Sequence, residues 1–231
     1  MESRGMHFLV LFLLLLAVIL GPQLWVRRVL QRHNRDDDSL AGTGGELARH
    51  LLDRYGLDKV KVESSELGDH YDPEAKAVRL TPDKLSGRTL TAVTTAAHEV
   101  GHALQDFSGY APFRWRSRLV GVAQGAEKLG SFLLFGVPLL TAVTKAPGAG
   151  LIMLLAAFCT LGMGIVVQLA TLPVEWDASF GKALPILRSG YIDEQRYPAA
   201  RRILRACALT YVAASLAGLL NFWRWMRLLR R

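Results

Sequence analysis

Residues 89–106 read TLTAVTTAAHEVGHALQD, and they are the most informative stretch of the chain. Thr89 followed by small and apolar residues predicts a helix over 89–106, which Gly109 closes. Because His98 and His102 are four positions apart, both imidazoles lie on one side of that helix. Two imidazoles so placed suit one tetrahedral Zn²⁺, and Glu99 is near enough to take a proton from a metal-bound water. The stretch therefore predicts a hydrolytic site holding one zinc ion per chain.

The residues before this helix predict a small extramembrane α+β domain over residues 36–115. Thr43 and Glu46 have the spacing of a capping box, at the start of a helix that Gly56 ends. Residues 60–62 and 77–80 are expected to form short strands, and residues 70–74 have the composition of a turn.

The remainder of the chain is far more apolar. Of the 231 residues, 51% are hydrophobic and 21% are charged. No Asp, Glu, Lys or Arg occurs in residues 5–26, 129–144, 146–174 or 206–223. Since about 20 apolar residues cross a bilayer as a helix, we expect a mainly α, integral membrane protein with about four transmembrane helices. The expected segments are an anchor (5–26), the zinc-binding domain (36–115), two transmembrane helices (129–145 and 147–174), a third-ligand helix segment (175–203) and a transmembrane or interfacial helix (204–223).

The net charge of +8 is concentrated beside these stretches, as in residues 27–35, 201–205 and 224–231. Basic residues in such places favour a lipid bilayer over nucleic acid as the partner. The positive-inside rule applied to residues 27–35 places the zinc site on the cytoplasmic side of the plasma (inner) membrane. Cys159 and Cys207 fall inside the uncharged stretches, which excludes a disulfide-rich scaffold.

A catalytic zinc site needs a third protein ligand. Glu175 directly follows the uncharged stretch 146–174, and two expected spans separate it from His102. An even number of crossings returns the chain to the same side of the membrane, so Glu175 is the favoured candidate. Carboxylates within residues 36–115 stay open as alternatives.

Four separated motifs resemble the YugP-like family of membrane zinc metallopeptidases: DHYDP (69–73), VRLTP (78–82), HEVGHALQ (98–105) and LPVEWDAS (172–179). The resemblance, which extends distantly to HtpX-like proteases, implies a zincin-like (gluzincin) domain with Glu175 as the third ligand. By analogy with gluzincin-like folds, the strand at 77–80 would pair with an extended substrate. The chain departs from the family pattern at Trp176 and Phe180, which bears on the shape of the pocket.

These observations predict a membrane-embedded, zinc-dependent endopeptidase acting on a peptide or a membrane protein, with Glu99 as general base. His70, Tyr71 and Tyr191 are candidate oxyanion donors, and Asp177 is a candidate acceptor for a ligating imidazole. One alternative is a site-2-type intramembrane protease, which the absence of the corresponding third-ligand loop disfavours. Another is a non-catalytic zinc-binding membrane scaffold or chaperone.

Overall fold

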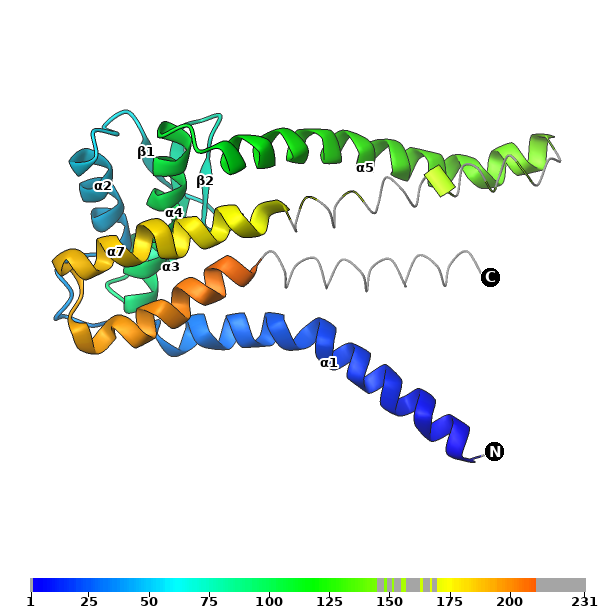
Figure 1. The fold of residues 1–231 in the computed structure, drawn as a ribbon, viewed down its shortest axis with the longest axis horizontal. Helices are drawn as coiled ribbons and strands as arrows, with labels where there is room; N and C mark the ends of the chain where they lie inside the picture. The colour runs from blue at the N-terminus through cyan, green and yellow to red at the C-terminus, as the bar shows by residue number, and fades with distance from the viewer. Residues whose placement is uncertain are drawn as a thin grey trace. The chain divides into compact units, whose positions relative to one another are not determined.

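The computed structural model describes residues 2–144 and 170–210, together with positions 148, 151, 155, 156, 163 and 167. The chain divides into two compact units, Met1–Tyr110 with Leu172–Arg231, and Ala111–Thr171. The described part of the second unit is mostly one long helix, α5 (Ala111–Thr144) (Figure 1). The first unit contains α1 to α4, a small sheet and the segment bearing Glu175, so it holds the candidate site.

The predicted zinc helix is confirmed as α4 (Leu90–Phe107), which lies in the core of the first unit. Thr89 caps its N-terminus, where the side-chain hydroxyl accepts a hydrogen bond from the Ala92 N–H at 3.0 Å. Every residue from Leu90 to Ala103 is buried. Gly109 follows with a φ of +65°, the left-handed conformation that favours glycine after a helix.

The preceding helix, α2 (Gly44–Arg54), packs against α4. Its predicted capping box is confirmed, since the Thr43 side chain accepts from the Glu46 N–H and the Glu46 carboxylate accepts from the Thr43 N–H. Gly44 is needed for the close packing, because a Cβ there would lie 2.4 Å from the Lys84 carbonyl oxygen. Lys84 belongs to the short helix α3 (Pro82–Ser86), which leads into α4.

The sheet has three strands, β1 (Lys61–Ser64), β2 (His70–Asp72) and β3 (Ala77–Leu80), in the order β1-β3-β2. β1 runs parallel to β3, and β2 runs antiparallel to it. The sequence predicted a turn where β2 forms. Because β3 is paired on both sides, its backbone has no free edge for a substrate, and the expected pairing at 77–80 is wrong.

The chain returns to the first unit through a helical stretch at residues 170–176 and then the π-helix η1 (Asp177–Ala183). α7 (Leu184–Ile186), η2 (Leu187–Tyr191) and η3 (Glu194–Arg196) follow, and residues 197–210 are helical. η1 packs on α4, and this segment crosses α4 in yellow in Figure 1. A π-helical turn of this kind is frequent at functional sites.

The expected fold class needs correction. The described residues form a mostly helical fold with a small sheet, and among them no helix combines the length and apolar character needed to cross a membrane. About four transmembrane helices were expected from counting uncharged positions. That count includes Gly, Pro, Ser, Thr and Gln as if they were apolar, and α1 (Glu2–Arg32) and α5 also contain arginines. Most of 147–174, and 211–223 within the last expected segment, lie outside the described residues.

Candidate metal centre

His98 and His102 project from one face of α4 and are both buried, at 3% and 5% exposure. Their ring centroids are 4.8 Å apart, as expected for imidazoles one helical turn apart. Gly101, which lies between the two histidines in the sequence, allows η1 to pack closely on α4. A Cβ at this position would lie 2.8 Å from the Ala178 carbonyl oxygen in η1, so glycine lets the two segments approach closely.

That approach brings the carboxylate of Glu175 to the two imidazoles. Its Oε2 lies 3.2 Å from His98 Nε2 and 3.3 Å from His102 Nε2. Glu175 is fully buried, and neither carboxylate oxygen has a hydrogen-bond donor among the described residues. One atom from each of the three side chains lies within 4.8 Å of the others, so together they could hold a metal ion.

The hydrogen bonds of Ser179 fix the orientation of the His98 ring. Its hydroxyl donates its single proton to the Leu204 carbonyl oxygen at 3.1 Å. The same oxygen lies 3.1 Å from His98 Nδ1, so it must accept a hydrogen bond from the Nδ1–H. A neutral imidazole protonated at Nδ1 leaves the Nε2 lone pair free to bind a metal.

Gln105 does the same for His102. Its amide group donates to the Val174 carbonyl oxygen at 2.8 Å and to Asp177 Oδ2 at 2.9 Å. Those two acceptors fix which end of the amide is NH₂, so the remaining oxygen, 3.0 Å from His102 Nδ1, accepts the Nδ1–H. Gln105 is fully buried, and its hydrogen bonds connect His102 of α4 to Val174 and Asp177, which lie before and after Glu175 in the chain.

Two imidazole lone pairs and a carboxylate therefore converge on one buried point. Such groups repel one another unless a cation lies among them, so the donor set fits a divalent metal. Burial acts to raise the pKa of Glu175, whereas positive charge at His98 and His102 lowers it well below its usual range, so the carboxyl group is ionised when a cation lies among the three side chains. The residues present thus fit the three-ligand zinc site predicted from the sequence.

Glu99 is buried beside the ligands, at 6% exposure. Burial raises the pKa of its carboxyl, and the negative charges of Glu175 and Asp69 act in the same direction, against the two imidazoles. A carboxylate with a raised pKa is a stronger base than an exposed one, which suits a group that accepts a proton.

The four further candidates lie in different environments. Asp177 does not contact an imidazole directly but accepts from Gln105, which in turn accepts from His102. The Tyr71 hydroxyl donates to Asp106 at 2.7 Å, and burial raises its pKa. The roles predicted for these residues stay predictions.

The other two candidates have local partners. The Nδ1 atom of His70 is 3.0 Å from the Gly68 carbonyl oxygen, within the turn that precedes β2. The Tyr191 hydroxyl accepts from Arg54 at 2.8 Å and lies 2.9 Å from His50 Nε2, so it joins η2 to α2.

Gln105 and Ser179 were not singled out from the sequence. Gln105 is three positions after His102, and Ser179 is four positions after Glu175, which are spacings that share a helical face. Since a ligating histidine almost always donates its other ring N–H, a search at these spacings could have found them.

Comparison with known proteins yields two matches. The model of the family described as "Putative neutral zinc metallopeptidase" matches residues 8–230. The chain is also 35% identical over 222 residues to "Putative membrane protease YugP" of Bacillus subtilis (strain 168), covering 94% of this chain and 95% of that protein. No solved structure matches.

Proposed function

Because the chain belongs to the neutral zinc metallopeptidase family, we propose that it is a membrane-associated endopeptidase whose zinc ion is held by His98, His102 and Glu175. The observation that carries this proposal is the convergence of two Nε2 atoms on a buried carboxylate that has no hydrogen-bond donor. One zinc ion per chain follows from the single set of three ligands found among the described residues.

Each side chain of the site has its own role in the proposed peptide hydrolysis. When bound, Zn²⁺ supplies Lewis acidity and lowers the pKa of a coordinated water. Glu99 accepts the proton of the attacking water and delivers it to the leaving amine. Gln105 and Ser179 hold the two imidazoles in the tautomer that leaves Nε2 free, and Gly101 allows Glu175 to reach them.

An open, largely apolar groove of about 640 Å³ runs along the segment that follows Glu175. Trp176 and Phe180 form its wall, with ring centroids 4.5 Å apart, and Trp176 is 52% exposed. Tyr110 and Leu172 also line it. We infer that this groove receives an apolar side chain of the peptide or membrane-protein substrate, because its walls are aromatic and it adjoins a metal ligand.

The membrane association is supported by the name of the Bacillus relative and by the apolar surface of α1. Among the α1 residues whose burial the structure describes, the exposed large apolar ones are Val10, Leu13, Leu14, Leu20, Leu24 and Trp25. Arginines 27, 28 and 32 follow in the same helix. The cytoplasmic leaflet carries the anionic lipids that attract such residues, so we propose that the site works on the cytoplasmic side.

Cleavage by the full chain tests the proposal. The wild-type protein should hydrolyse peptides in a fluorogenic library, and Glu99→Gln should lower the rate at least about 10²-fold while zinc stays bound. Glu66→Gln, at an exposed position, is the matched control and should cleave as the wild type does. Cleavage by Glu99→Gln at the wild-type rate would contradict the general-base role. A zinc-loaded wild type that cleaves no peptide would favour the scaffold alternative.

A further inference from the structure

A second cavity, of about 410 Å³, lies at the base of α1, between α1, α3, α4 and the helical residues 197–210. Its lining is amphiphilic. Val26 and Leu30 give it an apolar side, while Arg27, Gln31, Lys84 and the acidic Asp83 bring polar groups to it. The volume is within the range of small-ligand sites, and none of these residues belongs to the proposed zinc site.

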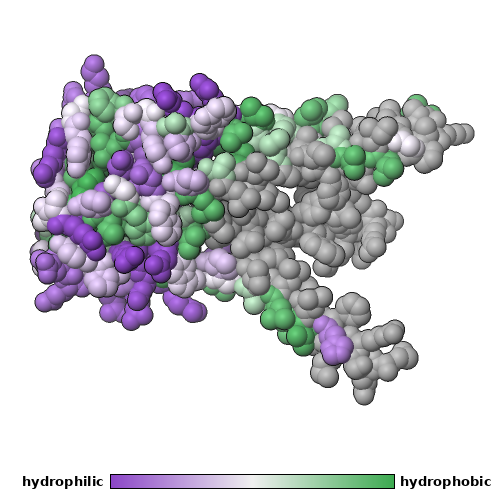
Figure 2. Space-filling view, in the orientation of Figure 1, coloured by the Kyte–Doolittle hydropathy of each residue, from purple (hydrophilic) through white to green (hydrophobic). Residues whose placement is uncertain are grey.

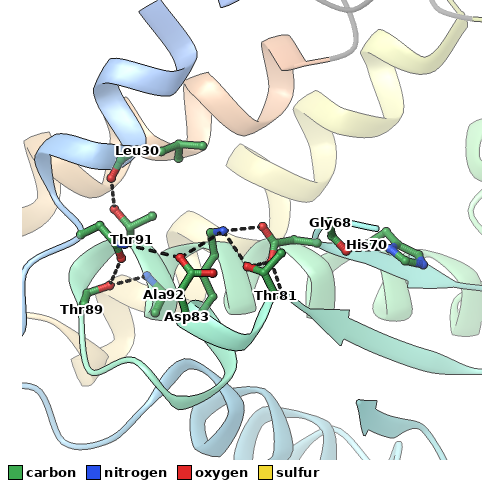
Figure 3. A network of polar contacts seen from close by, with 11 residues as sticks. Leu30, Gly68, His70, Thr81, Asp83, Thr89, Thr91 and Ala92 are labelled. Carbon is green, nitrogen blue, oxygen red and sulfur yellow. Dashed lines mark hydrogen bonds and ion pairs between the residues drawn. The ribbon is translucent and has the colours of Figure 1, made fainter. Parts of the chain in front are cut away.

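The walls of this cavity are held by hydrogen bonds between α1 and α4. The Thr91 hydroxyl donates to the Leu30 carbonyl oxygen at 2.8 Å (Figure 3). The Thr91 N–H donates to the His33 carbonyl oxygen at 3.2 Å, and the Thr89 hydroxyl donates to Asn34 at 2.9 Å. The end of α1 is thus fixed on α4, so the cavity is formed before any ligand arrives.

Two cationic side chains, Lys84 and Arg27, line this cavity, and they differ in whether a carboxylate neutralises them. Lys84 is 12% exposed, pairs with Asp69 at 2.8 Å and lies 3.8 Å from Asp83, so these two acids balance its charge and it offers none to an anion. Arginine ion pairs in the described part of the chain engage Arg49, Arg79 and Arg196. Arg27 is exposed and has no acidic partner among the described residues, so its charge is available to an anion.

Other arginines that have no acidic partner within the described part of the chain add to the positive charge around this cavity. Arg28 and Arg32 of α1, and Arg202 of the helical residues 197–210, are exposed. The arginines of α1 and Arg202 lie near each other, since the pKa of His33 is lowered by burial and then by the charges of both Arg32 and Arg202. The base of α1 is therefore a cationic surface with a preformed cavity in it.

On the N-terminal side of Arg27 the surface of α1 changes from cationic to apolar. Leu20, Leu24 and Trp25 are exposed there, and Figure 2 shows the described residues of α1 beyond the purple body mainly in green. A tryptophan between apolar residues and arginines is typical of the boundary between acyl chains and headgroups. Gln23, Val26 and Arg27 line the cavity, so it lies at this boundary, and a ligand that fits both sides has an anionic head and apolar tails.

We propose that this cavity binds the headgroup of an anionic phospholipid, with the phosphate against Arg27 and the acyl chains along the exposed apolar residues of α1. Gln31 is placed to hydrogen-bond the glycerol part of the headgroup. The inference rests on the membrane association proposed above and is independent of the peptidase chemistry.

Native mass spectrometry of the full chain in a neutral detergent tests it. The wild type should bind dioleoylphosphatidylglycerol saturably and at least about tenfold more tightly than dioleoylphosphatidylcholine, because the zwitterionic choline offsets the phosphate charge. Arg27→Gln should weaken phosphatidylglycerol binding about tenfold, and Arg27→Lys should restore most of it. Arg201→Gln is the matched control, since it removes the same charge from an exposed residue outside the cavity and should change binding less than about twofold in 0.15 M salt.

Three results would overturn the proposal: equal binding of the two lipids, equal losses in Arg27→Gln and Arg201→Gln, or glycerol 3-phosphate binding as tightly as the lipid. The last would identify a soluble phosphate ligand. Flotation with vesicles of phosphatidylcholine alone tests membrane association separately from the anionic-lipid site. A protein that floats with them but shows no preference for the anionic lipid retains its membrane association and lacks this site.

Discussion

Replacing Gln105 with methionine removes the hydrogen bonds that orient His102 while nearly keeping the shape of the side chain. Gln105 is fully buried, and the change leaves three polar groups without their partner, namely His102 Nδ1–H, the Val174 carbonyl and Asp177 Oδ2. Each buried group left unsatisfied costs about 1–3 kcal/mol. Loss of a residue that orients a metal-binding histidine lowers metal affinity about 10–100-fold. We therefore expect Gln105→Met to bind zinc about 10–100-fold more weakly than the wild type.

The assay is competition for zinc with a chromophoric chelator, combined with the visible spectrum of the Co²⁺-substituted protein. Gln105→Glu separates the two ends of the side chain, because it still accepts from His102 but cannot donate to Val174 or Asp177. Its zinc affinity should fall between those of the wild type and Gln105→Met. Gln195→Met, at an exposed position, is the matched control. Wild-type zinc affinity and an unchanged Co²⁺ spectrum in Gln105→Met would refute the reasoning.

Three further changes test the packing, the groove and the acid stability. Gly101→Ala places a Cβ 2.8 Å from the Ala178 carbonyl oxygen, so it should lower both the zinc affinity and the free energy of unfolding, the latter by about 1–3 kcal/mol. Gly121→Ala has open space around it and should do neither, as denaturant titration will show. Trp176→Ala should raise KM about fivefold for peptides with a large apolar residue and leave kcat unchanged, since the ring binds without touching the reacting atoms. The pKa of Asp72 is lowered because backbone N–H groups in the following turn hydrogen-bond its carboxylate, so its stabilisation is present above about pH 4 and is lost as the pH falls further. Asp72→Asn should therefore melt below the wild type at pH 7 and at the same temperature near pH 2; a constant difference in Tm would contradict this.

The elements with strong local signals could be predicted from the sequence. The capping box of Thr43 and Glu46 begins α2 as expected, and the helix expected over residues 89–106 is α4, which begins one residue later, at Leu90. The family resemblance is also confirmed by the family model and by the Bacillus relative. These features depend on residues that are near one another in the sequence, where helix geometry alone sets the outcome.

The features that the sequence did not reveal depend mainly on packing between residues far apart in the chain. The strand β2 was missed because its three residues resemble a turn and pair only when β3 is beside them. The spacing of Ser179 from Glu175 could have suggested this residue, but its hydrogen bond with His98 forms only because η1 lies on α4, and that packing is not visible in the sequence. The expected transmembrane helices were wrong for the described residues, among which no helix combines the length and the apolar character needed to cross a membrane.

Zinc content is the most direct test of the central claim that Glu175 closes the metal site. The wild type and Glu99→Gln, purified as full chains without added chelator, should each contain one zinc per chain, since Glu99 is not a ligand. Glu175→Gln should lose nearly all of it, because a neutral amide cannot replace the buried carboxylate between two imidazoles. Undiminished zinc in Glu175→Gln, with His98→Ala empty, would show that another residue supplies the third ligand.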